Sequence, residues 1–190
     1  LKAVNNIPIH PNKARKKRFS FGLEPPLGWT AILAFVLFTA VCIFSGATAI
    51  LRNGYIAVSF AVGAFLYFKY PILYIGFTWW LWFVTPFITR IVDLRSGFDP
   101  SRFMLVSQYL VTLLTLHTLV VYLPKSLRQG GLPFVMAFLG VFYGSLIGLI
   151  KTSPMTVARG IFDWLPPVVF AFFLFIKWRE YPQYRQVLQR

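Results

Sequence analysis

The feature that most constrains this chain is a series of apolar runs, each about as long as a lipid bilayer is thick. The first run, residues 29–51, reads WTAILAFVLFTAVCIFSGATAIL and contains no charged residue. A helix of roughly 20 apolar residues crosses the hydrocarbon core of a membrane. Only 13% of the residues are charged and 57% are hydrophobic, whereas a soluble domain carries about 25% charged residues. The sequence therefore predicts an all-α integral membrane protein.

Turn signals and isolated charges divide the apolar sequence into six expected spans. Arg52-Asn53-Gly54 predicts a turn after the first span, and Lys69-Tyr70-Pro71 predicts a second turn inside the long run 55–89. A lysine in the middle of a membrane costs about 2.5–3.5 kcal/mol, and proline interrupts a helix. Two short spans therefore fit this run better than one long kinked helix. The expected spans are residues 29–51, 55–68, 72–89, 103–123, 132–150 and 161–178. The last span contains Pro166-Pro167, so either it is kinked or its first turn lies in the membrane interface.

The basic residues predict how the spans are oriented. The net charge is +14, and six spans place 13 of the 19 Lys and Arg residues on the side that holds both termini. Because cytoplasmic loops carry an excess of Lys and Arg, we expect both termini to be cytoplasmic. A basic arm, residues 1–27, and a basic tail, residues 179–190, then lie beside the anionic headgroups of the membrane lipids.

Several functional classes do not fit the sequence. A strongly basic soluble domain can bind nucleic acid, but no such domain exists outside the apolar runs, so we expect membrane lipids and no nucleic acid as partners. The single cysteine, Cys42, and the two histidines, His10 and His117, form no metal-ligand pattern. The chain also lacks a phosphate-binding glycine loop, a nucleophile elbow and a metalloprotease motif. We therefore expect no metal and no cofactor.

The densest polar segment is RIVDLRSGFDPSR, residues 90–102, which the six-span topology places as a loop on the outer side. Arg90 and Arg95 can grip a phosphate in bidentate fashion, with Asp93 orienting one of them. Arg102 is a weaker candidate for the same role. The alternative is structural: Asp93 and Asp99 pair with the arginines and hold the loop closed, with Asp99 in a turn.

Four further polar residues are weaker candidates. Gln108 and His117 lie in the fourth expected span, where a polar side chain either has a function or is satisfied by packing. Arg159 and Asp163 are four residues apart, a spacing at which opposite charges pair on a helix. We expect that ion pair to hold the start of the last span.

Three glycines mark the fifth expected span. Gly140, Gly144 and Gly148 recur every four residues and so share one face of a helix. Small residues at this spacing allow another helix to approach closely. The pattern predicts that this span lies in the centre of the bundle.

Several stretches resemble bacterial O-antigen polymerase/ligase-like proteins. Residues 70–100 contain an aromatic span that ends in the pattern P-F-x-x-R-x-V-D-x-x-x-G, from Pro86 to Gly97. LPFVMAFLGVFYGSLIGLI resembles the glycine-bearing span of that family. IFDWLPPVVFAFFLFIKWREYPQYRQVLQR resembles its N-W-L-x-P span and the Y-P-x-Y-R stretch after it, with Asp163 where such sequences often have Asn. The resemblance covers about residues 29–190.

The resemblance implies a protein of the bacterial cytoplasmic membrane that takes glycans from polyprenyl-pyrophosphate carriers, without a metal. Arginines would stabilise the charge of the pyrophosphate leaving group. Family members are longer and carry their catalytic residues in a later half, so only the turn from Arg90 to Gly97 is carried over. We expect the chain, which begins at Leu1, to be the membrane half of such a glycosyltransferase-type enzyme.

Two other functions fit the sequence. The chain can be a non-enzymatic structural subunit of a larger complex, because no complete active site is present in it. It can also be a small lipid-binding or transport scaffold, although its few intramembrane charges argue against transport of ions or protons.

Overall fold

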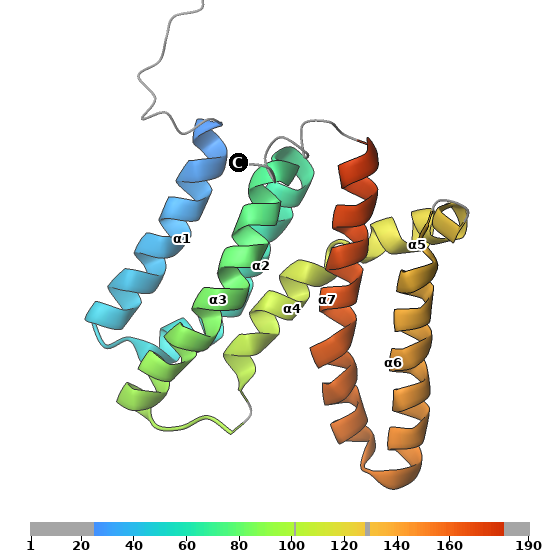
Figure 1. Cartoon of the computed structure of the whole chain (residues 1–190). Helices are drawn as coiled ribbons and strands as arrows, with labels where there is room; N and C mark the ends of the chain where they lie inside the picture. Colours follow the sequence, from blue (N-terminus) through green and yellow to red (C-terminus); the bar gives the residue numbers. More distant parts are fainter. Residues whose placement is uncertain (1–24, 101, 128–129, 181–190) are drawn as a thin grey trace, which may run out of the picture.

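The computed structural model describes residues 25–100, 102–127 and 130–180, without the side chains of residues 179 and 180. Helices account for nearly all of these residues, and the described part of the chain contains no strand (Figure 1). Five helices are long and apolar enough to cross a membrane, or six if one bent pair counts as a single span. These features confirm the prediction of a helical, multi-pass membrane protein.

The first three helices form an antiparallel layer (Figure 1). They are α1 (Pro26–Phe44), α2 (Thr48–Lys69) and α3 (Pro71–Ser96). Large side chains from all three are fully buried between them, among them Phe35, Tyr55, Leu66, Tyr74 and Leu81. The rings of Phe35 and Tyr55 lie 5.1 Å apart, and the Tyr55 hydroxyl lies 3.1 Å from Thr85 Oγ1. This core positions the end of α3 relative to α2.

One predicted turn is confirmed and the other is wrong. Helix α2 ends at Lys69 and α3 begins at Pro71, as the sequence predicts. Residues 52–54, however, lie inside α2, and the chain turns earlier, at Gly46 with φ 74°. Gly54 serves packing instead: a Cβ there would lie 3.1 Å from the Phe38 ring. The first expected span, residues 29–51, is thus divided between α1 and α2.

Helix α3 is longer than the expected span 72–89. It continues to Ser96 and ends at Gly97, where φ is 90°. Ile88 and Val92 continue its buried face, which explains why the helix does not stop at the first charged residue. The prediction that residues 90–102 form one loop is therefore wrong, because only residues 97–102 connect α3 to the next helical segment.

The fourth expected span is a broken helix. A short 3₁₀ turn, η1 (Phe103–Leu105), leads into α4 (Val106–Leu113), and α5 (Leu116–Ser126) follows at a bend of 45°. At the break, the Thr115 hydroxyl donates to Thr112 O (2.8 Å) and the Tyr74 hydroxyl donates to Val111 O (2.7 Å). Side-chain bonds to helix carbonyls of this kind bend helices.

Two long helices complete the fold, α6 (Leu132–Lys151) and α7 (Pro154–Glu180). Helix α7 starts seven residues earlier than the expected span at 161 and continues as one helix through Pro166-Pro167. It packs against α4, α5 and α6. Helix α6 has no buried residue and lies at the edge of the molecule beside α7 (Figure 1), so the prediction of a central fifth span is wrong.

Helix α1 begins and α7 ends at the same end of the molecule (Figure 1). The connections at residues 45–47, 97–102 and 152–153 lie at the opposite end. This arrangement agrees with an even number of membrane crossings. The cytoplasmic orientation of the termini stays a prediction, and the expected arm and tail fall mostly outside the described residues.

Candidate functional site: an arginine cluster at the end of α3

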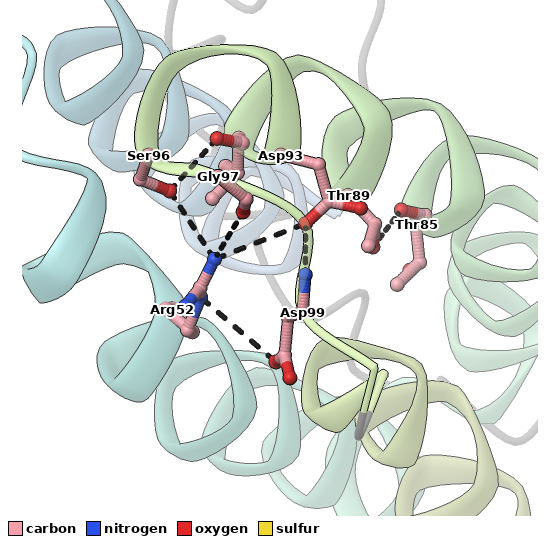
Figure 2. A network of polar contacts seen from close by, with 8 residues as sticks. Arg52, Thr85, Thr89, Asp93, Ser96, Gly97 and Asp99 are labelled. Atoms are coloured by element: carbon pink, nitrogen blue, oxygen red, sulfur yellow. Dashed lines mark hydrogen bonds and ion pairs between the residues drawn. The ribbon is translucent and has the colours of Figure 1, made fainter.

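The principal polar site joins α2 to the end of α3 through one arginine (Figure 2). The Arg52 guanidinium lies 3.8 Å from Asp93 Oδ1 and 4.0 Å from Asp99 Oδ2. It donates hydrogen bonds to Ser96 Oγ (3.2 Å) and to Gly97 O (3.3 Å). The Asp99 N–H donates to Asp93 Oδ1 (3.3 Å). We call these five residues the Arg52 cluster; it closes the turn that follows α3.

The local sequence explains why the cluster forms there. Asp93 and Ser96 are three residues apart and so share one face of α3. The Ser96 hydroxyl donates to Val92 O (2.8 Å), which leaves its oxygen free to accept from Arg52. The carbonyls at the end of a helix carry partial negative charge, and Gly97 presents one of them to the guanidinium.

The Arg52 cluster is only partly accessible to solvent. The side chains of Arg52, Asp93 and Asp99 are 29%, 11% and 15% exposed. A carboxylate that is so nearly buried requires a charged partner or several hydrogen bonds. One arginine lies beside both acids here, so it offsets one of their two negative charges and the cluster keeps a net negative charge.

Arg90 and Arg95, the two predicted phosphate contacts, do not act together. They are five residues apart on a helix of 3.6 residues per turn, so their side chains leave α3 about 140° apart. Arg95 donates to Ile43 O at the end of α1. Arg90 is exposed, and its side chain forms no hydrogen bond or ion pair within the described part of the chain. Neither arginine pairs with Asp93 within 4 Å.

Arg102 contributes through its backbone. It adopts a left-handed conformation with φ 50°, its N–H donates to Asp99 O (3.2 Å), and its carbonyl accepts from Leu105 N (3.0 Å). These bonds connect the turn to η1. The Arg102 side chain is exposed.

Asp163 takes part in a second polar contact, between α4 and α7. The Tyr109 hydroxyl donates to Asp163 Oδ1 (2.7 Å), and the Tyr109 ring lies edge-on to Trp82, 5.5 Å away. The predicted Arg159–Asp163 ion pair is wrong, because no such pair lies within 4 Å among the described residues. Asp163 therefore connects two helices, and Arg159 is exposed.

Gln108 and His117 have opposite surroundings. Gln108 is 4% exposed and its Oε1 has no hydrogen-bond partner, as is also true of the neighbouring Ser107 Oγ. The backbone carbonyl of Gln108 accepts from Thr112 Oγ1 (2.7 Å). His117 lies exposed on α5, away from the described acids, so the structure assembles no proton relay around it.

The sequence analysis missed Arg52 as a member of the site. Only a weak signal was present: Arg52 and Asp93 lie on opposite sides of the turn at residues 69–71, in helices that pack antiparallel. Their separations from the turn differ by more than one helical turn, so sequence spacing alone does not pair them. The described residues contain no group of three or more metal-ligating side chains, and the Arg52 cluster contains acids and a cation but no activated nucleophile. Its geometry suits positioning.

Comparisons of the chain with models of protein families, with curated proteins and with solved structures found no match.

Proposed function

We propose that this chain is a membrane scaffold that positions polyprenyl-pyrophosphate-linked glycans during assembly of a cell-surface polysaccharide. The observation that carries the proposal is the Arg52 cluster. It lies at the end of the segment 86–97, which is also the segment that resembles O-antigen polymerase/ligase-like proteins. The proposed site is on the outer side of the bacterial cytoplasmic membrane.

The charges around the cluster suit an anionic carrier. Arg52 offsets one of the two negative charges of Asp93 and Asp99, which weakens their repulsion of a pyrophosphate. Arg90 and Arg102 then provide exposed guanidinium groups on either side of the turn. Guanidinium groups bind phosphate oxygens through charge-assisted hydrogen bonds. The cluster would hold the turn in place while the exposed arginines contact the carrier.

The proposal predicts that loss of the Arg90 side chain impairs glycan assembly. In cells whose glycan assembly depends on this protein, Arg90→Ala should shorten or reduce the glycan while the amount of protein in the membrane stays normal. Gel analysis of the glycan and immunoblotting of membranes measure the two quantities. Lys125→Ala is the matched control, because Lys125 is an exposed cation on α5.

An unchanged glycan in the Arg90→Ala strain, at normal protein level, would show that Arg90 does not bind the carrier. Loss of the protein from the membrane would instead assign Arg90 a structural role. Arg102→Ala provides a second test of the same contact, since only the backbone of Arg102 takes part in the turn.

A second function, a non-enzymatic subunit of a larger complex, is favoured by a different observation. Asp93, Asp99 and Asp163 all take part in contacts that hold helices or turns together, and α6 has no buried residue although it packs against α7. A stoichiometric complex that survives purification, combined with unchanged glycans after deletion of the gene, would support the subunit over the glycan scaffold.

A further inference from the structure

The hairpin of α6 and α7 contains a groove that the Arg52 cluster does not use. The two helices touch near Gly148, where a Cβ would lie 3.0 Å from Val157 Cγ2. At Gly140, Gly144 and Gly160 an added Cβ would meet nothing within 4 Å. The resulting α6–α7 groove has a volume of about 680 Å³; its lining includes Ala137, Gly140, Gly144, Val157, Gly160 and Trp164.

The groove is apolar and lies on the surface that would face lipid. Both helices are candidate membrane spans, and none of α6 is buried inside the protein. Trp164, which lines the groove, is 68% exposed. In a bilayer, hydrocarbon chains meet this surface along its length. The missing glycine side chains leave space in which one such chain can lie.

Two cations lie near the turn that joins α6 to α7. Lys151 and Arg159 are the only charged residues between positions 132 and 162. Lys151 lies three residues after Gly148, on the same face of α6 as the glycines, and it is exposed. Thr152 and Thr156 line the groove at this end, whereas Asp163 does not line it and accepts a hydrogen bond from Tyr109 in α4. An exposed cation, Lys151, therefore lies next to the end of the groove.

We propose that the α6–α7 groove binds an anionic phospholipid. Its acyl chain lies along Gly140 and Gly144, and its phosphate lies beside Lys151. An apolar groove with a cation at its end matches a phospholipid, in which an apolar acyl chain leads to an anionic phosphate. Basic residues at the membrane surface attract anionic headgroups. This site is distinct from the proposed contact with the glycan carrier, so either proposal can fail without the other.

The test compares two defined lipids that differ only in headgroup charge. The purified protein is mixed in detergent with phosphatidylglycerol or phosphatidylcholine that carry identical acyl chains, and native mass spectrometry counts the retained lipids. We expect the protein to retain phosphatidylglycerol several-fold more than phosphatidylcholine. Gly144→Leu, which fills the groove, and Lys151→Gln, which removes the cation, should each reduce this retention several-fold.

Two matched controls separate the groove from general effects of charge and bulk. Gly76→Leu adds the same side chain at an exposed glycine of α3 with free space around it, and Lys125→Gln removes an exposed cation from α5. Neither should change retention. Equal retention of both lipids, or equal losses in controls and test variants, would overturn the proposal. A dimer that Gly144→Leu disrupts would identify a second copy of the chain as the occupant instead.

Discussion

The layer of α1, α2 and α3 and the hairpin of α6 and α7 are both built from strongly apolar helices but are held together differently. In the most apolar window of α3, 44% of the residues are buried, and in that of α6 none are. The Arg52 cluster and the Tyr55–Thr85 hydrogen bond join α2 to α3. Between α6 and α7 the described residues show no hydrogen bond or ion pair outside the connecting turn.

The comparison shows that hydropathy is a poor guide to burial in this molecule. The mean hydropathy of the best window is 2.4 in α1 and 2.0 in α6, but only 1.4 in α3. The least apolar of these three helices is the most buried. Lipid is as apolar as a leucine side chain, so burying leucine between membrane helices gains little, whereas polar groups gain partners there.

The largest expected effect comes from removing the arginine that joins α2 to α3. Arg52→Ala leaves two nearly buried carboxylates without their cation, and we expect a loss of about 3 kcal/mol in the free energy of unfolding. Unfolding of the purified protein by increasing mole fractions of SDS measures this change in free energy. Arg90→Ala, which removes an exposed arginine of the same region, should have almost no effect.

A double-mutant cycle sharpens this prediction. Adding Asp93→Asn to Arg52→Ala should recover part of the lost stability, since it removes the charge of the carboxylate nearest to the lost guanidinium. If Arg52→Ala is as stable as the native protein, the ion pairs do not stabilise the layer. The layer then differs from the α6–α7 hairpin only in how tightly its side chains pack.

An intermediate effect is expected from adding one methyl group to a helix contact. Gly63 of α2 lies against α4, where a Cβ would be 2.9 Å from Val111 Cγ1. Gly63→Ala should therefore destabilise the protein by about 1–3 kcal/mol through overpacking. The matched variant is Gly144→Ala in α6, which has free space and should not lower stability. Similar SDS-unfolding curves for the two variants would contradict the difference in packing.

The smallest expected effect concerns one buried hydroxyl. Tyr55→Phe removes the 3.1 Å contact with Thr85, and interhelical hydrogen bonds in membranes contribute about 0.6 kcal/mol on average. Tyr143→Phe in α6 changes a hydroxyl on a side chain that is 66% exposed and should be neutral. A loss in the Tyr143 variant that equals the loss in the Tyr55 variant would break the comparison.

The sequence predicts the number and type of elements better than their packing. The turn at residues 69–71 could be predicted because Pro71 starts a helix as readily as it interrupts one. The prediction of a turn at residues 52–54 was wrong because Gly54 accommodates the Phe38 ring. This use of glycine depends on a neighbouring helix. The glycines of α6 likewise indicate space, but they do not indicate what fills it.

The candidate site could be predicted only in part. Asp93 and Asp99 were correctly placed in a closed turn as one alternative, but their partner is Arg52, 41 residues before Asp93. Such a pairing depends on how two helices are rotated against each other, which the local pattern does not fix. Helix rotation also explains why Asp163 accepts a hydrogen bond from Tyr109 and does not pair with Arg159.

The hydrogen bond between Tyr109 and Asp163 also bears on the order of assembly. One of its partners lies in α7, whereas α1, α2 and α3 make their contacts with one another without α7. Chains are made from the N-terminus, and their earlier parts fold first. The three-helix layer can therefore assemble while α7 is still being synthesised. Until α7 arrives, the Tyr109 hydroxyl lacks Asp163, and the side of α4 that packs against α7 is uncovered.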